Sequence, residues 1–83
     1  MAKKFALVVG ASGEIGIATS LSMAEAGWSL YLHFASNKEK VDELIVALDL
    51  AYPEQEFIPI QADLLDTSAI EVIVNSIYSL QSI

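Results

Sequence analysis

The chain has no cysteine, one histidine and few basic residues. Without thiols it can form neither a disulfide framework nor a thiolate metal site. His33 has no second histidine to pair with, which argues against a zinc site. Four lysines and no arginine oppose eleven acidic residues, and the formal net charge is −7. Because proteins that bind nucleic acids normally carry a basic patch, this balance argues against a nucleic-acid partner.

A long apolar run is absent from the N-terminus as well. Lys3 and Lys4 precede an apolar run over residues 5–9, and Gly10 ends that run. The run is too short for the core of a signal peptide or for a helix that spans a membrane. We therefore expect a cytoplasmic protein with no membrane partner.

Hydrophobic residues, in contrast, are abundant. They make up 54% of the 83 residues, although a domain of this length buries only about 60% of the surface of its unfolded chain. Either the surface is unusually apolar, or some side chains face parts of a protein that this sequence does not include. Residues 1–83 therefore form one small domain at most.

The glycines are concentrated in one loop. Gly10, Gly13 and Gly16 follow the apolar run and precede a helical pattern. A strand, a glycine loop and a helix in this order are typical of phosphate binding. Glycine lets the backbone approach an anion, and the helix N-terminus presents free N–H groups to it. The spacing fits neither G-x-G-x-x-G nor the Walker pattern; it is G-x-x-G-x-x-G.

Hydrophobic periodicity predicts three strands that alternate with three helices. The strands are expected over residues 5–9, 29–34 and 57–61. The first helix is expected over residues 14–26. The second is expected to begin at a capping box formed by Ser36 and Glu39 and to end before Pro53. Asp66 or Ser68 can cap the third helix, whose apolar stripe comprises Ile70, Ile73, Val74, Ile77 and Tyr78.

This order predicts the α/β class. Parallel strands with right-handed crossovers take the order 3-2-1 in the first half of a doubly wound nucleotide-binding fold. Pro59 lacks an amide donor and suits the outer strand, whereas the apolar strand 5–9 suits a central position. One neighbour of strand 5–9 is then missing. We interpret residues 1–83 as the N-terminal part of a larger nucleotide-binding domain.

Spacing also predicts which sides are buried. In helix 14–26 the side expected to approach the sheet comprises Ile15, Ala18, Ser22 and Ala26, and Gly27 is expected to end the helix. In strand 29–34, the two faces comprise Leu30, Leu32 and Phe34 on one side and Tyr31 and His33 on the other. The clearest helical stripe comprises Val41, Leu44, Ile45 and Leu48.

The glycine loop resembles that of the short-chain dehydrogenase/reductase superfamily. Compact members read T-G-x-x-x-G-I-G after the first strand, and this chain reads Val9-Gly10-Ala11-Ser12-Gly13-Glu14-Ile15-Gly16, with Val9 in place of threonine and Glu14 in place of the middle glycine. The resemblance extends to Ala62-Asp63-Leu64 after the third strand and so covers essentially the whole chain. It is most similar to the 3-oxoacyl-acyl-carrier-protein reductases, and it also resembles related reductases that act on modified elongation factor P.

The resemblance implies a Rossmann-type fold that binds a nicotinamide dinucleotide and, in the complete protein, transfers hydride to a carbonyl substrate. The cofactor-binding residues that it implies are Gly10, Ser12, Gly13, Ile15 and Gly16 in the loop, with Asp63 and Leu64 beside the adenine ring. The superfamily's catalytic tyrosine and lysine form Tyr-x-x-x-Lys. This motif is absent, because the residues four positions after Tyr31, Tyr52 and Tyr78 are Ala35, Glu56 and Ser82. No catalytic residue is assigned, and we expect residues 1–83 to be inactive alone.

The end of the second predicted strand indicates which dinucleotide binds. NAD-binding versions place an acid there to hold the ribose 2′-hydroxyl, but here the first acid is Glu39. Ser36, Asn37 and Lys38 offer donors to a 2′-phosphate instead, so we favour NADP over NAD. Alternatively, Ser36 only caps its helix and Lys38 is only solvated.

Glu14 and His33 need separate interpretations. A carboxylate ~6 Å from a pyrophosphate at an effective dielectric of ~20 repels it by an energy of order 3 kcal/mol. Alternatively, Glu14 swings outward and only complements the helix dipole. His33 is expected to be a packed or surface residue of its strand rather than a catalytic one.

Two other functions stay open at this point. The chain could be a nucleotide-binding or assembly module without catalysis. It could also begin an extended-type epimerase or dehydratase, because Gly10-x-x-Gly13-x-x-Gly16 matches that branch too. In every case an open apolar strand edge, or the stripe from Ile70 to Tyr78, predicts a homo-oligomer.

Overall fold

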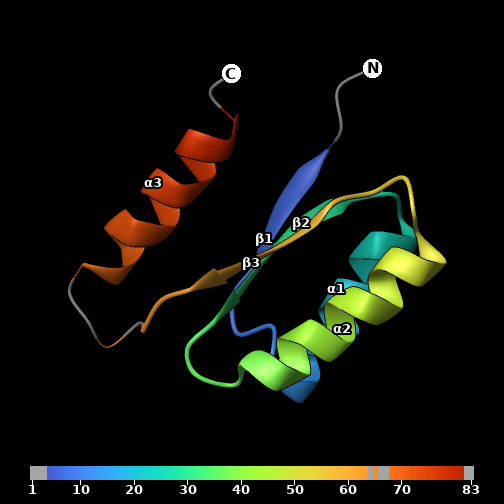
Figure 1. The fold of residues 1–83 in the computed structure, drawn as a ribbon, viewed down its shortest axis with the longest axis horizontal. Helices are drawn as coiled ribbons and strands as arrows, with labels where there is room; N and C mark the ends of the chain where they lie inside the picture. The colour runs from blue at the N-terminus through green and yellow to red at the C-terminus, as the bar shows by residue number, and fades with distance from the viewer. Residues whose placement is uncertain (1–3, 64, 66–67, 82–83) are drawn as a thin grey trace.

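The computed structural model describes residues 4–63, 65 and 68–81. Strands and helices alternate along the chain (Figure 1). Their bounds are β1 Phe5–Val8, α1 Glu14–Glu25, β2 Ser29–Phe34, α2 Lys38–Ala51, β3 Phe57–Gln61 and α3 Ala69–Gln81. The predicted βαβαβα order is confirmed.

The strands form one parallel sheet in the order β1-β2-β3, which is the predicted 3-2-1 order read from the other side. Phe5 is the register partner of Ser29, and Pro59 that of Leu32. Pro59 thus lies on an outer strand, as predicted, where its missing N–H is tolerated. Within the described residues, β1 pairs with β2 alone. The fold is the N-terminal portion of a Rossmann-type α/β fold.

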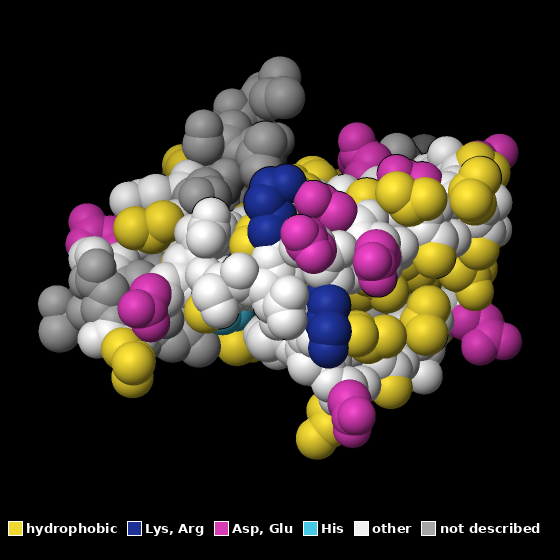
Figure 2. Space-filling view, turned by 60° about the horizontal axis from the view of Figure 1, so that its bottom comes forward, with side chains coloured by type: hydrophobic (Ala, Val, Ile, Leu, Met, Phe, Trp, Pro, Cys, Tyr) yellow, Lys and Arg dark blue, Asp and Glu magenta, His cyan; other side chains and the backbone are white. Residues whose placement is uncertain are grey.

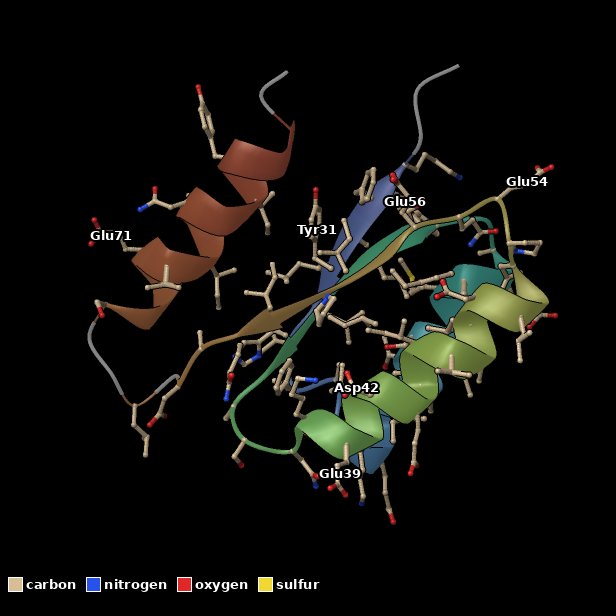
Figure 3. The ribbon with its side chains drawn as sticks, viewed as in Figure 1. Tyr31, Glu39, Asp42, Glu54, Glu56 and Glu71 are labelled. Atoms are coloured by element: carbon tan, nitrogen blue, oxygen red, sulfur yellow. The ribbon has the colours of Figure 1, made fainter. Side chains whose placement is uncertain are left out.

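Helices cover both faces of the sheet, α1 and α2 on one face and α3 on the other (Figure 1). All six residues of β2 are buried, because strands flank it and helices cover it. Its predicted alternation is confirmed, because Leu30, Leu32 and Phe34 pack in the core under α1 and α2. The side of α2 that faces this core comprises Val41, Leu44 and Leu48. Tyr31 points toward α3 (Figure 3) and stacks on Phe5 with ring centroids 5.0 Å apart.

Helix α1 presents a different side to the sheet from the predicted one. The predicted residues Ile15, Ala18, Ser22 and Ala26 are all exposed. The buried side comprises Gly16, Ser20 and Ala24. Two stripes of small residues run along this helix, so spacing alone does not choose between them. The close contact of Gly16 with the preceding loop, described below, selects the second stripe.

The helix ends show what local sequence decides. Gly27 follows α1 with a φ of +98°, as predicted. The capping box at Ser36 is wrong, because α2 begins one residue later with Asn37 as its N-cap and without a side-chain cap. Tyr52 has a φ of −133° and ends α2, since a residue before proline is disfavoured in the helical conformation.

Helix α3 buries less of its predicted stripe. Ile73 is buried and Ile77 half-buried, whereas the exposed members are Ile70, Val74 and Tyr78. The reason is the position of α3 beside β3, the outer strand, which gives it a narrow surface to cover. Asp66 lies outside the described residues. The Ser68 carbonyl accepts a hydrogen bond from the Val72 amide at 3.0 Å, which places Ser68 at the N-cap.

Candidate functional site

The glycine loop connects the carboxyl end of β1 to α1 and is folded by two glycines. Gly10 has a φ of +71°, a conformation that glycine adopts without steric cost. Its carbonyl accepts a hydrogen bond from the Gly13 amide at 3.2 Å, and Gly13 is the N-cap of α1. At Gly16 a Cβ atom would lie 2.0 Å from the Gly10 carbonyl oxygen, so only glycine fits. The predicted spacing therefore has a physical reason at both ends of the loop.

His33 anchors this loop to β2. Its backbone carbonyl accepts a hydrogen bond from the Ala11 amide at 2.7 Å, and its Nδ1 lies 3.1 Å from the Gly10 amide nitrogen. Its Nε2 lies 2.8 Å from the carbonyl oxygen of Ala62, just beyond β3. The side chain is buried, so of the two alternatives left open by the sequence it is packed rather than on the surface.

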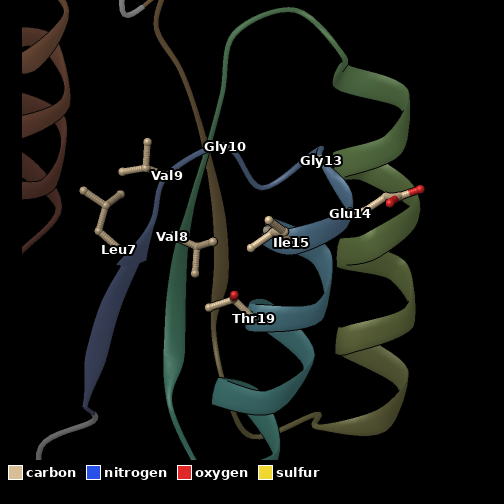
Figure 4. A pocket seen from close by; sticks show the side chains of 9 residues that line it. Leu7, Val8, Val9, Gly10, Gly13, Glu14, Ile15 and Thr19 are labelled. Atoms are coloured by element: carbon tan, nitrogen blue, oxygen red, sulfur yellow. The ribbon is translucent and has the colours of Figure 1, made fainter.

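An open cavity of about 520 Å³ lies beside the loop. It is lined by residues 7–10, 13–16 and 19 (Figure 4). Four of the predicted cofactor-binding residues are among them: Gly10, Gly13, Ile15 and Gly16. Ile15, in the first turn of α1, is 84% exposed and lines the open cavity. Ser12 is half-buried and does not line the cavity.

Glu14 borders the cavity, but its carboxylate points away from the side chains of Ile15 and Thr19 (Figure 4). The carboxylate is on the first turn of α1, where a negative charge is favourable. This orientation corresponds to the outward-swung alternative. The polar groups at the cavity then include the amides of the first turn, which have no preceding helical carbonyl to bond, and the hydroxyl of Thr19.

The predicted 2′-phosphate residues lie apart from this cavity, on the segment between β2 and α2. Ser36, Asn37 and Lys38 are all exposed. The Lys38 ammonium donates to the Asp42 carboxylate one helical turn further on, at 2.7 Å. Asp42 and Glu39 both project from the N-terminal part of α2 (Figure 3). Lys38 is therefore paired as well as solvated.

The residues predicted beside the adenine ring follow β3. Asp63 is exposed, and its Oδ1 accepts a hydrogen bond from the Leu65 amide at 3.0 Å. Leu64 lies outside the described residues. Because parallel strands end at the same edge of the sheet, Asp63, the loop and the segment after β2 lie at one edge.

The described lysines beside this edge, Lys38 and Lys40, lie among the acidic residues Glu39, Asp42 and Glu43 of α2. On the face shown in Figure 2, lysine side chains are interspersed with acidic and hydrophobic ones. Among the residues that the structure describes, none of the helices has the length and apolar character needed to cross a membrane.

Known proteins with the same arrangement identify the family. The family model for short chain dehydrogenase matches residues 4–81, nearly the whole chain. The chain belongs to the short-chain dehydrogenase family. A comparison of this chain with curated proteins gave no match.

The chain is also similar to a solved structure, the crystal structure of YwfH, described as an NADPH-dependent reductase involved in bacilysin biosynthesis. The two are 27% identical, with a TM-score of 0.86. The match covers 98% of this chain and 34% of YwfH. The chain thus spans about a third of the length of that reductase.

Two features of the candidate site were not predicted from the sequence. The cavity wall includes Leu7 and Thr19, which no motif singles out. The bonds of His33 to the loop were also missed. The available signal was its place near the end of β2, on the face opposite Leu32, next to the strand that leads into the loop.

Proposed function

We propose that this chain is the cofactor-binding, N-terminal part of an NADP-dependent short-chain carbonyl reductase similar to 3-oxoacyl-acyl-carrier-protein reductases. The observation that carries the proposal is the packing of Gly16 against Gly10 at the start of α1, beside an open cavity, in a chain of this family. Because Gly10, Gly13 and Gly16 have no side chains, their backbone atoms line the cavity and form part of its wall.

The residues present fit a dinucleotide. A Cβ atom at Gly10 would meet nothing within 4 Å, so the space beside that backbone is free for a ligand. The first-turn amides of α1 and its positive dipole end suit a pyrophosphate. Gly10, Ser12, Gly13, Ile15 and Gly16 would hold it, and Asp63 and Leu64 would contact the adenine ring.

The 2′-phosphate of NADP would lie near Ser36, Asn37 and Lys38. Each is exposed at the carboxyl end of β2, and no acidic residue comes before Glu39. The description of YwfH as NADPH-dependent supports the same choice of cofactor. We therefore expect NADPH to bind more tightly than NADH.

The chemistry proposed for the complete protein is reduction of a carbonyl substrate. The bound cofactor supplies the hydride. The chain's own residues bind and orient the cofactor, and the apolar wall from Leu7 to Val9 excludes water from one side of the cavity. Since Tyr-x-x-x-Lys does not occur in residues 1–83, the acid that protonates the product oxygen would come from further sequence.

Titration calorimetry of the gene's full product with NADPH and NADH tests the proposal. We expect NADPH to bind at least about tenfold more tightly, which corresponds to ~1.4 kcal/mol. Equal affinities for NADPH and NADH would contradict the proposed 2′-phosphate site. If neither dinucleotide binds, the proposed function is wrong. Residues 1–83 alone should bind weakly or not at all, so submicromolar affinity of that piece would contradict the division of the site.

The coding sequence beyond Ile83 separates the proposal from its alternatives. Asn-Asn-Ala-Gly and Tyr-x-x-x-Lys further along would support the reductase. A large C-terminal substrate domain would indicate an extended-type epimerase or dehydratase instead. A stop codon after Ile83 would leave a nucleotide-binding or assembly module without catalysis.

A further inference from the structure

His33 makes contacts that the proposed function does not use. It lies near the carboxyl end of β2, and its side chain is 1% exposed. The imidazole spans from the Gly10 amide, before α1, to the Ala62 carbonyl, after β3. One side chain on the central strand therefore connects the segments that follow the two outer strands.

The partners of the ring determine its protonation. The Gly10 amide can only donate, so Nδ1 must present its lone pair at 3.1 Å. The Ala62 carbonyl oxygen can only accept, so Nε2 must carry the hydrogen at 2.8 Å. Both bonds together require the neutral ring with its proton on Nε2. Either the other tautomer or the imidazolium would place an N–H against the Gly10 N–H.

These bonds hold the residues at the start of the glycine loop, Gly10 and Ala11. Gly10 has the positive φ of the loop, and its carbonyl is the group that Gly16 contacts. The Ala11 amide is held by the His33 backbone, so the residue fixes two consecutive amides, one through its side chain and one through its main chain. A shift of Gly10 would move the carbonyl that supports the first turn of α1.

The second partner connects the loop to the adenine side of the proposed site. Ala62 is buried and directly precedes Asp63. The imidazole ring thus connects the pyrophosphate loop to the segment after β3, in addition to the main-chain bonds that hold the Ala11 and Ala62 amides to the carbonyls of His33 and Phe34.

We propose that His33 is a positioning residue for cofactor binding. It holds Gly10, and through Gly10 the first turn of α1, in the arrangement that receives the pyrophosphate. The inference rests on the proposed function for its ligand, whereas the positioning of Gly10 stands on the hydrogen bonds alone. His33 itself would not touch the cofactor.

Two substitutions separate the two bonds of the ring. In His33→Asn the side-chain oxygen takes the place of Nδ1 and accepts from Gly10, but the reach to Ala62 is lost. In His33→Gln the side-chain nitrogen takes the place of Nε2 and donates to Ala62, but Gly10 loses its acceptor. Each variant loses one hydrogen bond, so their costs in stability are similar. The control is Gln55→Ala, which removes bonds to the Ala24 and Trp28 carbonyls at the opposite end of the sheet.

The readouts are the NADPH affinity of the gene's full product and the hydrogen exchange of the Gly10 amide. We expect His33→Gln to weaken NADPH binding about tenfold and to accelerate Gly10 exchange, because a partly buried amide loses its acceptor. His33→Asn should stay within about twofold of the wild type in affinity, a change smaller than the worth of one hydrogen bond. Gln55→Ala should lower stability without changing affinity.

Equal weakening by His33→Asn and His33→Gln, in proportion to their stability, would overturn the positioning role. Unchanged Gly10 exchange in His33→Gln would do the same. If the wild-type protein binds no NADPH, the proposed function fails, and Gly10 exchange still tests whether His33 positions the loop.

Discussion

The closest approach in the loop is at Gly16, where a Cβ atom would lie 2.0 Å from the Gly10 carbonyl oxygen and 2.8 Å from its carbon. Both are backbone atoms, which cannot move aside as the end of a flexible side chain can. At Gly13 the nearest atom would be 3.6 Å away, an ordinary contact, and its φ of −83° suits any residue. Close packing therefore requires glycine at position 16, whereas position 13 has room for a side chain.

This difference predicts unequal effects of the same substitution. Gly16→Ala should lower the free energy of unfolding by about 3 kcal/mol or more, because the helix must move away from the loop. Gly13→Ala should cost only about 1 kcal/mol or less, the difference between glycine and alanine at an N-cap. Urea unfolding of the two variants measures both. Equal losses would show that α1 is free to shift.

The tautomer of His33 is a second prediction at this scale. Nitrogen chemical shifts of the His33 ring should show the neutral imidazole with its proton on Nε2 and no proton on Nδ1, since the Gly10 amide donates to Nδ1. The pattern should persist in Gln55→Ala. A proton on Nδ1 would mean that Gly10 is not held by the ring.

How far sequence predicts a residue's role depends on whether the role leaves a pattern. Gly10, Gly13 and Gly16 have a spacing, and that spacing places all three at the cavity. His33 is a single residue on a strand, and its partners come from segments 23 and 29 residues away. No local pattern encodes contacts of that range.

At the scale of elements, the N-terminal part of α2 places the carboxylate of Asp42 next to the ammonium of Lys38. Its ammonium is 2.7 Å from the Asp42 carboxylate, and both side chains are largely exposed. Such a pair contributes little to stability because water and salt screen it. It nevertheless places a negative charge beside the residue proposed to receive the 2′-phosphate.

Asp42→Asn should therefore raise the preference for NADPH over NADH by about 1.4- to fivefold, since exposed pairs couple by roughly 0.2–1 kcal/mol. Stability should barely change. The matched control is Asp49→Asn, which removes the same charge from an exposed site further along α2. An equal gain in the control would mean that net charge, rather than Lys38, sets the preference.

Element positions followed from the sequence better than element orientations. The periods predicted all three strands and all three helices within a few residues. The rotation of α1 was not predictable, because two small-residue stripes have the same spacing and only the contact at Gly16 distinguishes them. The stripe on α3 was overestimated for a similar reason, since its burial depends on how wide a surface the sheet offers.

At the scale of the whole molecule, the two edges of the sheet differ. The β1 edge carries exposed apolar side chains, Leu7 at 40% and Val9 at 53%, and has no paired strand within the described residues. Exposed Val74 and Tyr78 form a second apolar surface, on α3. Both surfaces favour association of the isolated chain.

We expect residues 1–83 to self-associate at high micromolar concentration, as measured by sedimentation. Leu7→Lys should abolish association if it proceeds through β1, because a charge on an edge strand opposes pairing. Val74→Glu should abolish it instead if the surface is α3. A stable monomer of residues 1–83 at this concentration would show that neither surface drives self-association.

Pro59 gives this association a limit. It is the middle residue of β3, so the outer edge of the sheet lacks one amide donor and carries a bulky ring there. If two chains join through their sheets, they must join β1 to β1 about a twofold axis, which uses the open edge of both partners. The resulting sheet is closed: with proline at each outer margin, strand pairing stops at two chains and does not extend the sheet into a fibril.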